Sequence, residues 1–181
     1  MKKLFFVVVL VVAAYLVMPS TSYAQPYGYE GTQVCAMCHK TEKQGQQLKI
    51  WQESLHAKAF KTLQTPEADK IAAEKGFSTK AAETKDCLKC HASGYDVDKK
   101  LLGSKFKIED GIQCETCHGP GSAYKPMAVM KSREESIKKG MVFYEDKTKY
   151  CTDCHNSESP TFKGFNFEEM YKKIEHNVPK G

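Results

Sequence analysis

Eight cysteines and four of the six histidines fall into four copies of one short pattern, Cys-x-x-Cys-His. This spacing is the attachment signature of c-type heme, in which two thiols bond to the two vinyl groups of the porphyrin and the histidine binds the iron. The predicted attachment residues are Cys35, Cys38, Cys87, Cys90, Cys114, Cys117, Cys151 and Cys154, and the predicted iron ligands are His39, His91, His118 and His155. The sequence therefore predicts four covalently bound hemes c.

Two other uses of paired cysteines do not explain the pattern. A disulfide framework of a secreted domain has no need for a histidine after each second cysteine. A structural zinc site could use two Cys-x-x-Cys pairs, but the repeated histidines would then have no role. Heme attachment is the interpretation that uses every residue of the motif.

The motifs begin at residues 35, 87, 114 and 151, so their spacing is uneven and is not that of a regular repeat. A chain of this length cannot wrap each of four hemes in a pocket of its own. The sequence therefore predicts a compact multiheme c-type cytochrome, mainly α with long loops and little β structure, in which the hemes form much of the core. Hemes packed closely in this way exchange electrons readily.

Hydrophobic periodicity supports the helical prediction. One long amphipathic helix is expected over 44–64, where apolar residues recur every three or four positions, and Pro66 limits its end. Shorter helices are expected over 67–75, 132–139 and 167–177, the second of these with Ser132 as its N-cap. The stretch 105–108 has weak strand character.

Two histidines outside the motifs, His56 and His176, are candidates for the sixth coordination position of the iron. His56 lies within the apolar face of the first expected helix, where the alternative is an ordinary core histidine. His176 lies opposite the apolar stripe of the last expected helix, where the alternative is a surface histidine. Two histidines cannot complete four hemes, so at least one iron is expected to lack a strong second ligand.

The N-terminus reads as a secretory signal peptide. Lys2 and Lys3 precede an apolar run over 4–18, and small residues lead to Ala24, where we expect cleavage. Residues 1–24 are thus predicted to be removed, leaving 25–181 as a single tetraheme domain that is periplasmic or secreted and does not span a membrane. Losing the two lysines lowers the formal charge from +5 to +3, and each oxidised heme adds about −1, so the charge gives no case for nucleic-acid binding.

The arrangement of motifs and the residues around them resemble the tetraheme cytochrome c-554 family over most of the mature chain. The two most specific runs are the one from Trp51 to Ala59, with Ser-Leu-His-Ala-Lys-Ala at its end, and Gly111–Gly121, with Cys-Glu-Thr-Cys-His-Gly-Pro-Gly. The other matching stretches are Cys35–Lys40, Lys85–Gly94, Cys151–His155 with Ser159 and Pro160, and Phe165–Met170.

The resemblance implies a mostly helical fold with hemes stacked face to face in pairs. It implies that His56 ligates the third heme, opposite His118, and that His176 ligates the first heme, opposite His39. The second heme, on His91, would be high-spin with an open face. The family passes electrons from hydroxylamine oxidation toward membrane cytochromes.

The chain departs from the family in the segment after Gly-Pro-Gly. The family takes the distal histidine of the fourth heme from this segment, but 122–131 contains no histidine and offers Met127 and Met130 instead. A thioether is a known heme ligand that raises the reduction potential. We therefore predict that Met130 completes the fourth heme, opposite His155.

Three functions compete. The favoured one is an electron carrier, not an enzyme, that docks transiently with redox partner proteins. The second is a reductase of nitric oxide, nitrite or hydroxylamine at an open heme on His91. The third is a polymerising cytochrome whose neighbouring subunit completes a heme. The sequence does not identify the electron donor or acceptor, the reduction potentials or the oligomeric state.

Overall fold

The computed structural model describes residues 27–177, so the predicted signal peptide lies outside the described residues. Within them the prediction of a mainly α structure is confirmed, and the only β pairing is an isolated parallel bridge between Tyr29 and Leu102. The α-helices are α2 (Thr32–Ala36), α3 (Gln47–Glu53), α4 (Ala59–Thr62), α5 (Pro66–Glu74), α6 (Lys85–His91), α7 (Cys114–His118), α8 (Met127–Met130), α9 (Arg133–Lys138), α10 (Lys147–Thr152) and α11 (Phe167–Tyr171). Short 3₁₀ turns cover Glu42–Gln44, His56–Lys58, Ala81–Glu83, Lys99–Leu101 and Ile108–Asp110.

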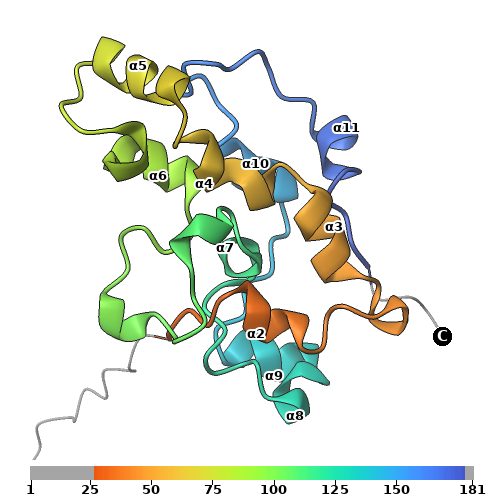
Figure 1. Cartoon of the computed structure of the whole chain (residues 1–181). Helices are drawn as coiled ribbons and strands as arrows, with labels where there is room; N and C mark the ends of the chain where they lie inside the picture. The colour runs from red at the N-terminus through yellow and green to blue at the C-terminus, as the bar shows by residue number, and fades with distance from the viewer. Residues whose placement is uncertain (1–26, 178–181) are drawn as a thin grey trace, which may run out of the picture.

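The helices are distributed between two ends of the molecule (Figure 1). Helices α5 and α6 lie at one end, α8 and α9 lie at the other, and α7 lies between them. Helices α3 and α11 occupy one side. Asn177, the last described residue, lies against the chain just before α3. A side chain placed on Gly45 would meet the carbonyl oxygen of Asn177.

Each of the four heme motifs forms one helical turn, which the hydrophobic periodicity had not predicted. The second and third motifs lie on α6 and α7, whereas the first and fourth begin on α2 and α10. In those two, the backbone N–H of His39 donates to the carbonyl of Cys35, and that of His155 donates to Cys151, both at 3.0 Å. A helical turn places residues three and four apart on one face, so the two thiols and the imidazole of each motif point the same way.

Two of the short helices predicted from the sequence are confirmed. Helix α5 begins after Thr65, whose hydroxyl accepts from the backbone N–H of Ala68, and it ends just before Gly76. Helix α9 begins after Ser132, whose hydroxyl accepts from the backbone N–H of Glu135 at 3.2 Å. In both helices the N-cap residue satisfies a backbone donor that has no partner inside the helix.

The long helix predicted over 44–64 is wrong, because the chain is broken at Ser54. This residue is extended, with φ −77° and ψ 163°, so α3 ends at Glu53 and a 3₁₀ turn leads into α4. The break is held by a loop distant in sequence, since Ile112 donates its N–H to the carbonyl of His56 at 3.0 Å and accepts from Trp51 Nε1 at 2.7 Å. These tertiary hydrogen bonds replace helical ones that the local periodicity favours.

Two other local expectations are also corrected. The helix predicted over 167–177 ends at Tyr171. The stretch 105–108 forms no strand and leads into the turn Ile108–Asp110.

The hydrophobic core is small. In the described part of the chain nine hydrophobic residues are buried, and four of these are alanines. The main cluster is built from Phe60, Leu63, Ala72, Ala81, Leu88 and Ala92, around the second motif. Such a core is too small to stabilise a domain of this size, so much of the interior must come from groups other than side chains.

No helix within residues 27–177 is both long enough and apolar enough to cross a membrane.

We expect Gly111→Ala to lower the free energy of unfolding by about 3 kcal/mol, because Gly111 has φ +70° and a Cβ there would lie 2.6 Å from the carbonyl oxygen of His56. Gly76 also has a positive φ, +85°, but open space around it, so Gly76→Ala should cost only about 1 kcal/mol. Guanidinium unfolding of the heme-loaded protein checks both values. Equal costs would show that the contact with His56 is unimportant.

Candidate heme sites

The first and third motifs lie side by side. Helices α2 and α7 are in contact, and the thiol of Cys35 hydrogen-bonds to the carbonyl oxygen of Gly31 at 3.9 Å. The neighbouring Cys114 thiol, followed by burial, raises the pKa of the Cys35 thiol. The two motifs are separated by a long stretch of sequence, so the fold brings together two attachment sites that the sequence keeps apart.

The other motifs continue this series of contacts. Burial and then the nearby Cys151 raise the pKa of Cys117 to about 11, which places the third motif beside the fourth. Burial and then the nearby Cys90 raise the pKa of Cys154 to about 12, which places the fourth motif beside the second. The four attachment sites therefore follow one another in space in the order first, third, fourth, second.

A cavity of about 390 Å³ opens beside Cys87, Cys90 and His91 of the second motif. Its apolar wall comes from α4, α5 and the residues after them, and consists of Leu63, Ala68, Ile71, Ala72, Phe77 and Ala81. Lys75, Asp86, Lys89 and residues 158–161 also line it. The only histidine in its lining is His91, and no methionine lines it, so no described side chain of either kind faces His91 across the cavity.

The ring of His91 is fixed by the backbone of α4. Its Nδ1 lies 2.8 Å from the carbonyl oxygen of Ala59, and because a carbonyl can only accept, Nδ1–H is the donor. The proton then resides on Nδ1 and leaves Nε2 free as a ligand. Metal-binding histidines are commonly held in this way through their second nitrogen.

Three histidines lie close together beside the third motif, and two of them, His118 and His176, line a second, smaller cavity. The rings of His118 and His176 are 6.0 Å apart, measured between centroids. Desolvation, then His176, lowers the pKa of His39, and desolvation, then His176 and His39, lowers that of His118. A lowered pKa keeps an imidazole neutral, which is the form that binds a metal. His176 thus lies among the motif histidines, although it is solvent-exposed.

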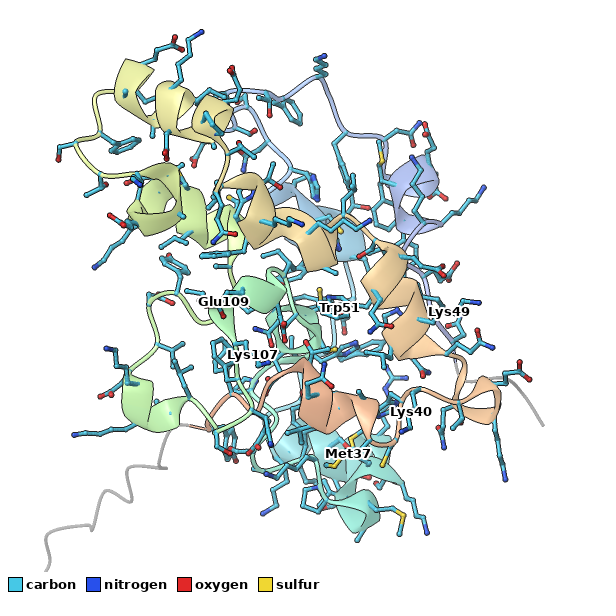
Figure 2. The ribbon with its side chains drawn as sticks, viewed as in Figure 1. Met37, Lys40, Lys49, Trp51, Lys107 and Glu109 are labelled. Atoms are coloured by element: carbon cyan, nitrogen blue, oxygen red, sulfur yellow. The ribbon has the colours of Figure 1, made fainter. Side chains whose placement is uncertain are left out.

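His56 also lines this smaller cavity, together with Cys114, Cys117 and His118. Its ring centroid lies 6.0 Å from that of His155, and burial, followed by His155, lowers its pKa. Trp51 lines the same cavity, and Figure 2 shows its side chain extending inward from α3 while Lys49 points outward. His56 is thus placed between the third and fourth motifs.

Met130 lies on α8, which packs against α9. Figure 1 shows α8 and α9 together at one end of the molecule, whereas α10, which carries Cys151, lies nearer α4. The side chains that do lie next to His155 are His56 and Phe165, whose ring stacks on the imidazole at 4.7 Å between centroids. The pairing of Met130 with His155 stays a prediction, for which the contact of α8 with α9 gives no support.

Three comparisons with known proteins agree with this geometry. The family described as "Cytochrome c554 and c-prime" matches residues 34–119. Cytochrome c-554 of Nitrosomonas europaea is 29% identical over 199 aligned positions, which cover 91% of this chain and 81% of that protein. A solved structure of the reduced state of cytochrome c554 from Nitrosomonas europaea matches 82% of this chain and 79% of its own, with 28% identity and a TM-score of 0.50.

The chain is a relative of cytochrome c-554. The likeness to that multiheme c-type cytochrome supports covalently bound heme c and electron transfer. The predicted resemblance is confirmed.

The cysteines of this cytochrome fit heme attachment. All eight are free of disulfides, and residues 27–177 contain no group of three or more histidine, cysteine or acidic side chains that could hold a metal ion by themselves. The thiols are therefore available to the porphyrin vinyl groups, and the disulfide and zinc alternatives have no support. A bound heme would supply a one-electron iron couple, which the motif histidines would hold and the apolar cavity walls would shield from water.

Sequence reasoning missed three groups that support these sites. The carbonyl of Ala59 leaves no signal in the sequence, because every residue has one. Gln113 and Glu115, which are 2% and 1% exposed, lie beside and within the third motif. The signal for Glu115 was present in the run Cys-Glu-Thr-Cys-His-Gly-Pro-Gly, which indicated the family but not what the carboxylate does.

Proposed function

We propose that this cytochrome carries four hemes and passes single electrons along them between redox partner proteins in the periplasm. The observation that supports this most is that the first, third, fourth and second motifs lie next to one another in that order. Helix α2 contacts α7, and the hydroxyl of Tyr150, next to the fourth motif, donates to the carbonyl of Thr116 in the third. The Sγ of Cys154 in the fourth motif lies 4.0 Å from the carbonyl oxygen of Lys89 in the second. Because each porphyrin is bonded to its cysteines, neighbouring cysteines bring neighbouring porphyrin edges together. An electron can then cross the molecule in short steps.

The periplasmic location rests on the leader sequence over 1–24. The order of the motifs also supports two separate points of entry, since the first and second motifs stand at the two ends of the series. Partners that dock at these ends can exchange electrons without competing for one surface. Contacts of this kind are small and short-lived in electron-transfer proteins.

His56 is the proposed distal ligand of the third heme, because it shares a cavity with Cys114, Cys117 and His118. His176 is then the proposed ligand of the first heme, opposite His39, whose pKa it lowers. Under this assignment the contact between His118 and His176 joins ligands of the first and third hemes. The contact between His56 and His155 joins ligands of the third and fourth. These two histidine contacts therefore link the same motifs as the contacts between motifs do, the first with the third and the third with the fourth.

The second heme has a proposed open coordination site. The cavity beside His91 offers apolar side chains but no second histidine and no methionine. An iron held there by His91 alone is high-spin.

Electron paramagnetic resonance of the oxidised protein, with each signal spin-counted, tests the open site. We expect a high-spin signal of at least about one heme, because nothing in the second cavity caps the iron. The first and third hemes should give the low-spin signal. The fourth heme has no assigned sixth ligand and can contribute to either signal. A spectrum without high-spin iron would contradict the open site.

His56→Ala should add about one high-spin heme to this spectrum, because it removes the proposed sixth ligand of one iron. Met130→Leu is the matched control, since the contact of α8 with α9 gives no support to Met130 as a ligand, and it should leave the spin count unchanged. An unchanged count in His56→Ala, with heme content intact, would show that His56 is not a ligand. A change in Met130→Leu would show that the methionine is a ligand.

A second candidate function is favoured by the same cavity. An open iron on His91 can bind nitric oxide or hydroxylamine, and Lys75, Asp86 and Lys89 provide polar groups at the cavity. We expect steady-state reduction of nitric oxide no faster, per high-spin heme, than that of a free heme peptide if the protein is only a carrier. Faster turnover would establish the reductase.

A further inference from the structure

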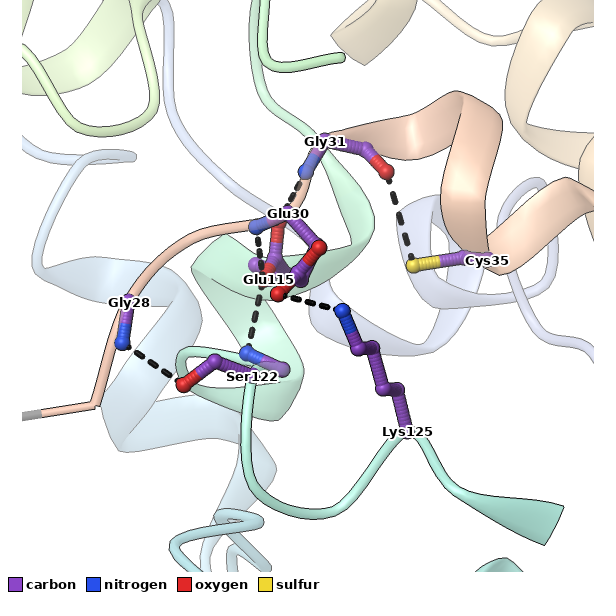
Figure 3. Close-up of polar contacts among 8 residues, drawn as sticks. Gly28, Glu30, Gly31, Cys35, Glu115, Ser122 and Lys125 are labelled. Carbon is purple, nitrogen blue, oxygen red and sulfur yellow. Dashed lines mark hydrogen bonds and ion pairs between the residues drawn. The ribbon is translucent and has the colours of Figure 1, made fainter. Parts of the chain in front are cut away.

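Glu115 is a buried carboxylate at the junction of the first and third motifs. It lies on α7, between Cys114 and Cys117, and is 1% exposed. Three backbone N–H groups donate to it (Figure 3): Glu30 at 2.8 and 3.0 Å, Gly31 at 2.7 Å, and Gly121 at 2.7 Å. Two of these donors precede the first motif and one follows the third.

The carboxylate has donors but no cation. Both of its oxygens accept and neither donates, which is the pattern of an ionised carboxylate. Within residues 27–177 it forms no ion pair, and the nearby Lys125 is bonded instead to Glu30, with Nζ 2.7 Å from Oε1. A charge that is buried without a counter-charge acts strongly on its surroundings, because the interior screens it poorly.

The surrounding backbone is shaped to reach this carboxylate. A Cβ on Gly121 would lie 2.9 Å from Glu115 Oε1, and Gly31 has φ +90° with no room for a side chain. Gln113 adds a parallel link, since its Oε1 accepts from the backbone N–H of Thr32 at 3.1 Å. The segment before the first motif is therefore bound to the third motif at successive residues.

The effect of the charge is visible on neighbouring groups. Burial and then Glu115 raise the pKa of both Tyr29 and Tyr124, because a proton on each phenol avoids a second negative charge. Glu115 also contributes to the raised pKa of Cys35, after the neighbouring Cys114 thiol and burial. The negative charge of Glu115 acts in the same way on any group bound at these cysteines, and it stabilises the more positively charged state of that group.

We propose that Glu115 joins the first motif to the third and that its uncompensated charge lowers the reduction potentials of the hemes on these two motifs. A nearby negative charge stabilises Fe³⁺ over Fe²⁺, and net charge is one of the factors that set a heme potential. With heme bound, the charge would make ferrous iron on the third motif a better donor of its electron to ferric iron on the fourth, with no bond broken and no proton moved. The inference rests on the proposed tetraheme function and biases its electron flow away from the first and third hemes.

Spectroelectrochemical titration of the heme-loaded protein tests this inference. We expect Glu115→Gln to raise the reduced-to-oxidised ratio of the affected hemes about tenfold at a fixed potential, which corresponds to about 59 mV for a one-electron couple. Glu115→Asp keeps the charge and should stay near the wild-type titration. Glu134→Gln is the matched control, because it removes the same charge from a side chain that is 78% exposed.

Three outcomes would overturn the proposal. An unchanged titration in Glu115→Gln would show that the charge does not act on the hemes. Equal shifts in Glu115→Gln and Glu115→Asp, or an equal shift in Glu134→Gln, would assign the effect to packing or to total charge.

Should Glu115→Gln fail to accumulate with its hemes, Glu30→Gln provides the second test. This change keeps the backbone N–H of Glu30 on Glu115 and frees Lys125 to offset its charge, so the potentials should rise by a smaller amount. No rise would overturn the proposal. Heme content and the spin count of the wild type separate this result from a failure of the tetraheme function, since they do not depend on Glu115.

Discussion

The close approach of the four attachment motifs is the constraint on which the rest of this structure depends. Each motif is a single helical turn, and a helix contact or a hydrogen bond joins it to the next in the series. The positions of the helices are therefore set by what is attached to them as much as by the packing of side chains. This accounts for the small number of buried hydrophobic residues in the described chain. It also accounts for the many short helices joined by loops.

The deepest part of the protein interior is polar. The largest fully buried side chains are Gln113, Glu115, Thr32 and Ser136, and none of these is hydrophobic. Buried polar groups are tolerated only when their hydrogen bonds are satisfied, and such bonds specify geometry more strictly than apolar contact does. The apolar cluster near the second motif provides hydrophobic stabilisation, whereas the polar contacts fix where the first and third motifs meet. The molecule thus uses different forces at its two ends.

The sequence predicted what depends on local residues and missed what depends on distant ones. Heme attachment followed from spacing alone, and α9 followed from Ser132, which caps its own helix. The break at Ser54 could not be predicted, because it is held by Ile112. The order of the motifs in space also depends on tertiary packing. His56 and His176 were found because histidine is rare here, but their neighbours were not predicted from spacing.

The placement of His176 has a consequence for how the protein matures. Its ring meets His118 and lies close to His39, so three histidines from both ends and the middle of the described chain form one cluster. Contacts so distant in sequence form late in folding, after local turns and nearby contacts. Cys35 and Cys38 lie within one local turn, whereas His176 joins the cluster only through contacts with distant parts of the described chain. Under the proposed ligation, porphyrin could therefore be bonded to the first motif before the sixth ligand of its iron is in place.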